Sequence, residues 1–367
     1  MQALLDYRPA LRARTGVGEY VHQTALALAA TAAPGDHVAV FSSSWKDRLT
    51  SPGAGIEARD AGVPVRLLNF AWHRLGAPPI EWLAGRADVV HSPTPMLIPS
   101  RRATRVVTVH DLFFLDHPEA TAAEVRRDYA SLAIRHAQRA DLVVTVSNTV
   151  GAQVVQRMDV DPERVVICPN GAPDWTARRA VPAAGPVICV GTLEPRKNIA
   201  GLLDAWERLL TGGLRVPLLL AGGAPTSADA LLARLLQPPL AGVVQHVGYL
   251  DHADRQRFYA AARLLVMPSF DEGFGLPAVE AMAAGVPVVL ARRGALPEVG
   301  GEAAVYVDPD DPQTLADEVA SLLADPSRLE SMRVAGIARS RLFSWTASAE
   351  RLWRAYRTAA RDQGSAR

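Results

Sequence analysis

The chain has 367 residues, of which 49% are hydrophobic and 21% charged, and this globular composition argues against a disordered or fibrous protein. Its 39 basic and 38 acidic residues leave a net charge of +1, so bulk charge does not favour binding to nucleic acid. The length exceeds that of one ordinary domain and predicts two.

In the first half of the chain, short apolar runs alternate with helix-length segments. This alternation is typical of parallel sheets whose faces are covered by helices. We expect helices at residues 18–30 and 121–139. The predicted strands are residues 3–6, 37–41, 63–68, 87–91, 105–110, 142–147 and 164–168.

The alternation stops at residues 169–186, where Pro, Gly, Ala and Arg dominate, and it then resumes. We therefore predict a first domain at 1–172, a linker at 173–186 and a second domain at 187–344. The fold class is α/β, with two doubly wound, Rossmann-like parallel sheets facing a cleft. The strands predicted in the second domain are residues 187–190, 218–221, 243–247, 264–267, 286–290 and 303–307.

The last segment, residues 345–361, has the pattern of an amphipathic helix with Leu352, Trp353 and Tyr356 on one face. We expect it to pack back onto a domain. At the other end, the first residues lack the apolar core of a signal peptide, and no run approaches the ~20 apolar residues of a membrane span. The expected location is the cytoplasm, with contact at the inner face of the membrane left open.

The most informative stretch is residues 268–298, where Glu272 and Glu280 frame a glycine-rich helix start. Pro277 suits a first helical turn and Gly285 suits a helix end, so we predict a helix at 277–284. The amides of residues 274–276 at the start of that helix favour a phosphate group. In the structural alternative the glycines only close a turn and both glutamates are solvated. We favour the functional reading because two carboxylates around such a start form a specific arrangement.

Arg196 and Lys197 follow the predicted strand 187–190 and precede the next helix. They therefore belong to a loop at the carboxyl end of a strand, where two cations suit a diphosphate. A solvated pair is the alternative, and the nearby glutamate segment favours the functional interpretation.

Two further candidate segments in the first domain lie at or just after the ends of predicted strands. Gly16 and Gly18 lie between the first strand and first helix, where they allow close approach of the backbone to a ligand. His110 ends a strongly apolar strand, where a polar side chain can face a substrate. His91 ends another strand in the same way and is the weaker candidate.

Other chemistries lack their sequence signals. No third glycine completes a dinucleotide fingerprint, and there is no phosphate-binding P-loop, no nucleophile elbow and no Cys/His cluster with metal spacing. We therefore expect neither a metal ion nor a cofactor at the site.

Together these segments resemble the retaining glycosyltransferases of family 4, which have the GT-B architecture. The resemblance covers nearly the whole chain. It rests on the pair Glu272 and Glu280 with FGLP between them, and on TGVGEY, TVHDL, PNG, GTLEPRKN and FSWTASAE in the expected order.

The resemblance implies a role for each of these residues. Lys197 and Arg196 would hold the diphosphate, and Glu272 and His110 would contact the donor sugar. Thr192 stands where many members have arginine, and Arg196 would supply that charge. The final helix at 345–367 would cross back to the first domain. The donor-binding residues implied by the resemblance would be Gly16, Gly18, Gly273, Phe274, Gly275, Leu276 and Glu280.

The resemblance is to a bacterial mannosyltransferase branch and implies transfer from GDP-mannose to a glycan or lipid-linked acceptor, without a metal ion. A UDP-sugar-dependent transferase, a sugar-nucleotide epimerase and a non-catalytic nucleotide-sugar binder remain alternatives. The acceptor is expected near His110 and the loop at 12–14. The predicted helix at 121–139 carries Arg126, Arg127, Arg135 and Arg139, which are either a solvated basic face or a contact with anionic lipid.

Overall fold

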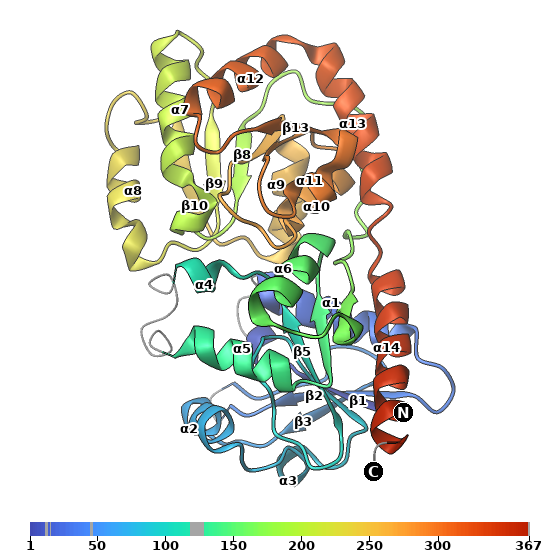
Figure 1. Ribbon diagram of the computed structural model, residues 1–367. Helices are drawn as coiled ribbons and strands as arrows, with labels where there is room; N and C mark the ends of the chain where they lie inside the picture. The colour runs from blue at the N-terminus through green and yellow to red at the C-terminus, as the bar shows by residue number, and fades with distance from the viewer. Residues whose placement is uncertain (12–13, 15, 45–46, 118–127, 366–367) are drawn as a thin grey trace. The chain divides into compact units, whose positions relative to one another are not determined.

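The computed structural model describes residues 1–11, 14, 16–44, 47–117 and 128–365 (Figure 1). It divides into two compact units. Unit 1 comprises Met1–Gly171 and Ser344–Arg367, and unit 2 comprises Ala172–Phe343. The segment expected as a linker belongs to unit 2, because Arg178 Nε donates to the Gly285 carbonyl at 2.9 Å.

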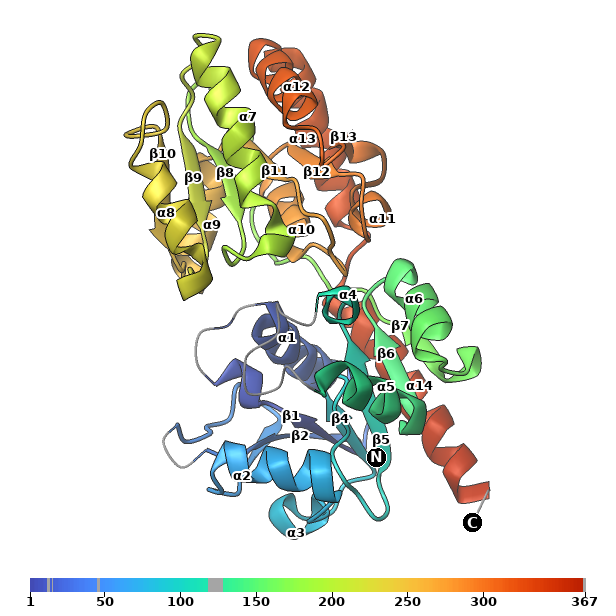
Figure 2. The same ribbon diagram turned by 60° about the vertical axis from the view of Figure 1, so that its left-hand side comes forward.

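Unit 1 is built on a seven-stranded parallel sheet with the order β3-β2-β1-β4-β5-β6-β7 (Figure 2). Its core strands are rich in Val, Leu and Ala, as expected when helices cover both faces of a sheet. The strands are β1 (Gln2–Asp6), β2 (His37–Ser42), β3 (Ile56–Asp60), β4 (Val89–Ser92), β5 (Thr104–Val109), β6 (Leu142–Thr145) and β7 (Val165–Ile167).

Helices on unit 1 include the last helix of the chain, α14, which packs against α1 near the sheet (Figure 1). The helices of unit 1 are α1 (Gly16–Ala30), α2 (Val65–Phe70), the π-helix η2 (Ala71–Leu75), α3 (Glu81–Ala84), α4 (Phe113–Asp116), α5 (Tyr129–Arg139), α6 (Asn148–Met158) and α14 (Trp345–Ser365). Short 3₁₀ turns are η1 (Arg8–Ala10) and η4 (Pro162–Arg164).

Unit 2 repeats this plan with six parallel strands in the order β10-β9-β8-β11-β12-β13. Its strands are β8 (Val187–Val190), β9 (Leu218–Ala221), β10 (Val244–Gly248), β11 (Leu264–Met267), β12 (Val288–Ala291) and β13 (Ala304–Val307). Its helices are α7 (Ile199–Thr211), α8 (Asp229–Leu235), α9 (His252–Ala261), α10 (Leu276–Ala284), α11 (Leu296–Gly300), α12 (Pro312–Ala324) and α13 (Pro326–Ser340), with 3₁₀ turns η5 (Pro195–Lys197), η6 (Thr226–Ala228) and η7 (Gly301–Ala303).

The predicted strand at 63–68 is wrong. Residues 65–70 form helix α2, and Leu68 and Trp72, four residues apart, enter the core beside Ile80. The third strand is instead β3 at the edge of the sheet, where Glu57 and Ala58 are exposed. An edge strand buries little, so its sequence lacks the apolar run that marks the other strands.

The predicted helix at 121–139 lies partly outside the described residues, and so do Arg126 and Arg127. Its described part, α5, begins at Tyr129 and leaves Arg135 and Arg139 exposed. No helix among the described residues is both long enough and apolar enough to span a membrane.

Candidate active site

In the sheet of unit 2, β9 and β10 are added on one side of β8, and β11, β12 and β13 are added on the other side. The strand order therefore reverses between β8 and β11. In open parallel sheets, ligands bind at such a point, beyond the carboxyl ends of the two strands. The loop after β8 carries Arg196 and Lys197, and the loop after β11 carries Glu272. The sheet topology therefore brings Glu272 to two adjacent cations that lie 75 and 76 positions before it in the sequence.

Glu272 lies between the two cations. Lys197 Nζ donates to Glu272 Oε1 at 2.5 Å, and Arg196 Nη1 donates to Glu272 Oε2 at 3.0 Å. The Ser269 hydroxyl, itself buried, adds a bond of 2.9 Å to Oε1. Arg196 also pairs with Glu194 at 2.9 Å. The two cations expected to face a diphosphate thus already have carboxylate partners in the protein.

The Glu272 carboxylate stays charged despite its burial. Only 5% of the residue is exposed, and this burial by itself would raise the pKa. Lys197 and Arg196 outweigh the burial, so the pKa of Glu272 lies below its ordinary value. The result is an anion fixed between two cations, all at one edge of the sheet.

Asn198 joins the loops that carry this cluster. Its side-chain amide donates to the Pro268 carbonyl at 3.1 Å and to the Pro309 carbonyl at 2.7 Å. Its Oδ1 accepts from the Gly201 amide and caps α7. The loops after β8, β11 and β13 are therefore held by one buried side chain, whose role the sequence interpretation missed.

Gly294 is a second residue that was missed. Its φ of 56° lies in the left-handed region, and a Cβ atom there would stand 2.6 Å from the Glu272 carbonyl oxygen. The next amide, of Ala295, donates to that same oxygen at 2.8 Å. A glycine four residues after a predicted strand was the available signal, because only glycine permits this close support of the Glu272 backbone.

The glycine-rich segment Gly273–Leu276 leads into α10, which begins one residue before the predicted start. Gly275 has φ of 91°, and a Cβ atom there would lie 2.7 Å from Leu296 Cδ2. The buried Phe274 ring packs edge-on against Phe343, with ring centroids 5.5 Å apart. These contacts fix the direction in which the first turn of α10 presents its backbone amides.

Glu280 is separate from the Glu272 cluster and lies in the interior of α10. Tyr259 donates its hydroxyl to Glu280 Oε2 at 2.9 Å, and Arg255 approaches Oε1 at 3.2 Å. Tyr259 and Arg255 thus hold the Glu280 carboxylate in a fixed position within unit 2.

In unit 1, His110 follows β5 and packs edge-on against Tyr20, with ring centroids 4.7 Å apart. Its Nε2 lies 3.0 Å from the Pro93 carbonyl. A carbonyl can only accept, so Nε2 must donate and a neutral His110 has Nδ1 as an acceptor. Burial lowers the pKa of His110, which favours this neutral form.

Gly16 and Gly18 open α1. A Cβ atom at Gly18 would lie 2.7 Å from the Pro9 carbonyl oxygen, whereas one at Gly16 would meet nothing within 4 Å. Gly18 thus has a packing role, the close approach of α1 to η1. His91 is buried and bonded within the core, which accords with its lower functional weight.

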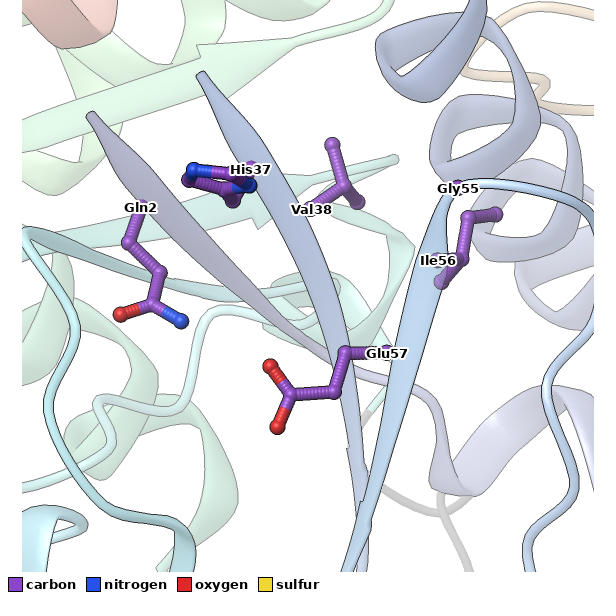
Figure 3. A pocket seen from close by; sticks show the side chains of 6 residues that line it. All are labelled: Gln2, His37, Val38, Gly55, Ile56 and Glu57. Carbon is purple, nitrogen blue, oxygen red and sulfur yellow. The ribbon is translucent and has the colours of Figure 1, made fainter. Parts of the chain in front are cut away.

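Two pockets described in unit 1 lie at the amino ends of its strands, whereas the candidate site residue His110 follows the carboxyl end of β5. The pocket of Figure 3 has a volume of about 500 Å³ and is lined by Gln2, His37 and Ile56, the first residues of β1, β2 and β3, together with Val38, Gly55 and Glu57. The second, about 590 Å³, includes Asp88 and Thr104 at the starts of β4 and β5. Neither contains a predicted site residue.

Models of two domain families match the chain. The model described as Glycosyltransferase Family 4 matches residues 14–174. The model described as Glycosyl transferases group 1 matches residues 185–325. Each model thus corresponds largely to one of the two sheets.

A curated relative and two solved structures extend these matches. O-antigen chain mannosyltransferase B of Escherichia coli is 32% identical over 270 residues, covering 70% of this chain and 71% of that protein. Sucrose-phosphate synthase from Thermosynechococcus elongatus has a TM-score of 0.77 at 24% identity, covering 97% and 98% of the two chains. Anabaena Alr3699/HepE, solved in complex with UDP-glucose, has a TM-score of 0.67 at 18% identity and full coverage of both chains. At these identities, the structures establish a shared fold.

Proposed function

Because the chain belongs to glycosyltransferase family 4 and has the GT-B fold, we propose that it transfers mannose from GDP-mannose to a hydroxyl of a glycan or lipid-linked acceptor. The observation that carries the proposal is the burial of Glu272 between Lys197 and Arg196 where the strand order of unit 2 reverses. The similarity to the Escherichia coli mannosyltransferase supports mannose as the sugar.

A UDP-sugar is the second candidate donor, and it is favoured by the likeness to the Anabaena protein that was solved with UDP-glucose. The two donors share the diphosphate and sugar and differ in the base. The cluster around Glu272 is suited to the shared part.

Breaking the bond between sugar and phosphate leaves negative charge on the diphosphate. We propose that Lys197 and Arg196 turn from Glu272 toward this charge, while the first-turn amides of α10 add their partial positive charge. Both cations have long, rotatable side chains, and Arg196 can keep Glu194 as a partner. Glu272 is then available to accept hydrogen bonds from hydroxyls of the sugar, which holds the donor in place.

For the sugar transfer itself, we propose retention of configuration. The acceptor oxygen forms its bond to the anomeric carbon on the face from which the diphosphate leaves. The bond between that carbon and the phosphate oxygen breaks, and a phosphate oxygen of the departing diphosphate takes the acceptor proton. His110 contributes a neutral Nδ1 that accepts from a hydroxyl of the donor sugar.

We propose that the reaction needs no metal ion, since Lys197, Arg196 and the α10 amides already supply positive charge at the diphosphate. Turnover should therefore be the same with and without EDTA. Loss of turnover on chelation, and its recovery with Mg²⁺ or Mn²⁺, would contradict this part of the proposal.

A lipid-linked acceptor would bring the protein to a membrane surface. Unit 1 exposes large apolar side chains on α2 and η2, namely Leu67, Phe70 and Leu75, each more than 60% exposed. Arg66 and Arg74 lie in the same short segment, and Arg74 also pairs with Asp128 at 2.5 Å. Apolar side chains with adjacent arginines are suited to an anionic lipid surface, and we propose peripheral contact there.

Incubating the purified protein with GDP-mannose or UDP-glucose, with and without a candidate glycan acceptor, tests the function. The account predicts release of a nucleoside diphosphate together with a glycosylated acceptor. Conversion of the donor to an isomeric nucleotide sugar would indicate an epimerase. Tight binding without turnover across a broad panel of acceptors would favour a non-catalytic binder.

A further inference from the structure

Four buried polar side chains in unit 1 form an unbroken hydrogen-bonded chain. The Tyr356 hydroxyl, on α14, lies 2.6 Å from His91 Nδ1 on β4. His91 Nε2 lies 2.6 Å from Thr108 Oγ1 on β5, and that hydroxyl lies 3.0 Å from the hydroxyl of Tyr20 on α1. The chain therefore links two helices through two neighbouring strands of the sheet.

All four residues are at most 2% exposed. Buried polar groups are costly unless they are paired, and a fully paired network holds its members in fixed positions. Burial lowers the pKa of His91 to about 3, so its ring is neutral and has one donor and one acceptor nitrogen. The adjacent hydroxyls can serve either role, and the network is satisfied as a whole.

This hydrogen-bonded network is connected to His110 at two points. Tyr20, its last member, packs its ring edge-on against the His110 ring. Pro93, whose carbonyl holds His110 Nε2, comes two residues after His91 in the sequence. In addition, His110 comes two residues after Thr108, directly beyond the end of β5.

The final helix contributes at a second point. Trp345, the first residue of α14, has its ring 6.4 Å from that of Tyr20. Trp345 itself is seated against Gly171, where a Cβ atom would come within 2.4 Å of its ring. Helix α14 thus constrains Tyr20 in two ways. Tyr356 acts on the Tyr20 hydroxyl through the hydrogen-bonded network, and Trp345 lies beside the Tyr20 ring.

We propose that Tyr20, Thr108, His91 and Tyr356 are positioning residues that fix the ring and tautomer of His110, so that a residue of the last helix affects sugar transfer without touching substrate. This inference rests on the proposed role of His110 in transfer. The alternative is a purely structural network that only docks α14 onto unit 1.

A matched pair of variants on α14 separates these possibilities. Tyr356→Phe removes only the hydroxyl that begins the chain. Trp353→Phe keeps an aromatic ring beside Tyr356, whose ring centroid is 5.9 Å away, and removes another buried hydrogen bond of this helix, between Trp353 Nε1 and the Leu28 carbonyl at 3.1 Å, which is not part of the network. Both should lower the melting temperature modestly. At a temperature well below both transitions, we expect Tyr356→Phe to reduce kcat by about 10-fold with little change in donor KM, and Trp353→Phe to remain within about 2-fold of the parent.

Nuclear magnetic resonance of ¹⁵N-labelled histidine gives a readout that is independent of activity. The His110 signals, assigned from a His110→Gln variant, should show the Nε2–H tautomer in the parent protein and in Trp353→Phe. In Tyr20→Leu and Tyr356→Phe they should broaden or show a mixture of tautomers. If His110 signals are unchanged in both, or if the two α14 variants lose kcat equally, the positioning role is wrong. If His110 responds as expected but no donor is turned over, the proposed function fails and the positioning does not.

Discussion

Lys197 is one of two lysines in the chain, the other being Lys46, so 39 minus 2 leaves 37 arginines. In a protein that otherwise uses arginine, an ammonium group at this position indicates a requirement for a compact cation. The structure supplies a reason: the Lys197 stem lies against Gly191, where a Cβ atom would be 3.1 Å from Lys197 Cε. The ammonium group at the end of this packed stem is placed by its bond to Glu272, and a planar guanidinium would present its donors differently.

We therefore expect Lys197→Arg to be almost as harmful as Lys197→Ala. Each should reduce kcat/KM for the donor by about 10²–10³-fold, because the charge at the leaving diphosphate is misplaced or lost. Steady-state release of nucleoside diphosphate measures this, with Arg215→Lys on the surface of unit 2 as the control. Near-parental turnover by Lys197→Arg would show that charge alone suffices.

His110 predicts the pH dependence of turnover. Burial lowers the pKa of His110 below 6.5, and Asp111 and the Pro93 carbonyl oppose this effect only in part. Above that lowered pKa, neutral Nδ1 accepts from the sugar; below it, the protonated nitrogen can only donate. Turnover should be constant above pH 6.5 and fall on acidification through the lowered pKa.

His110→Gln keeps an acceptor oxygen that does not titrate. Its kcat should be lower than that of the parent, but this acid limb should disappear from the pH profile. An identical acid limb in His110→Gln would assign the titration to another group.

The types of the site residues could be predicted from the sequence, but not all of their contacts. Glu272 and Lys197 follow strands of the second sheet, whose carboxyl ends lie together, and His110 follows a strand of the first sheet. The pairing of both cations with carboxylates could not be predicted, because it depends on how separate loops fold against each other. The same holds for Asn198, whose partners lie 70 and 111 positions away.

Among the secondary-structure elements, α2 was wrongly predicted as a strand, and it also carries exposed apolar side chains. A short run of mostly apolar residues, such as 63–68 with Arg66 within it, fits a strand or a short helix equally well, and tertiary packing decides between them. Here Leu68 and Trp72 point inward, and Leu67 and Phe70 are left exposed.

We expect this surface to bind anionic membranes. The double variant Leu67→Ser with Phe70→Ser should cosediment several-fold less with vesicles of phosphatidylcholine and phosphatidylglycerol than the parent does, because apolar area is lost. Turnover on a water-soluble acceptor should be unchanged. Leu236→Ser, at a leucine in unit 2 that is even more exposed than Leu67, is the control. Equal sedimentation of parent and double variant would exclude α2 as the contact.

Across the whole molecule, the two sheets could be predicted from the alternation of strands and helices in the sequence. The strand orders could not be read from the sequence, because each order depends on which face every connecting helix covers. The histidines are also divided unevenly between the units: unit 1 contains seven of the nine, and only His246 and His252 belong to unit 2.

This division predicts that acid destabilises unit 1 first. Burial lowers the pKa of His91 to about 3 and that of His136 to about 4, whereas the unfolded chain protonates near 6.5. Stability is therefore fully present above about pH 6.5 and is lost as the pH falls below it, by up to about 1.4 kcal/mol per pH unit for each such histidine.

Differential scanning calorimetry at pH 5 should resolve two transitions, of which only the later one, from unit 2, rises on addition of nucleotide. At pH 7.5 the two should lie closer together. If nucleotide raises the earlier transition at pH 5, the assignment of acid sensitivity to unit 1 is wrong.

The most direct measurement of the central claim is calorimetric titration of GDP and UDP into the parent protein and three variants. If Glu272 competes with a diphosphate for Lys197 and Arg196, then Glu272→Gln should bind the preferred nucleotide at least as tightly as the parent, although sugar transfer is lost. Lys197→Ala should bind about 10-fold or more weakly, since a charge-assisted bond contributes about 1.5–3 kcal/mol, and Arg215→Ala should match the parent. Parental affinity in Lys197→Ala, or no affinity for either nucleotide in the parent, would contradict a diphosphate site at this cluster.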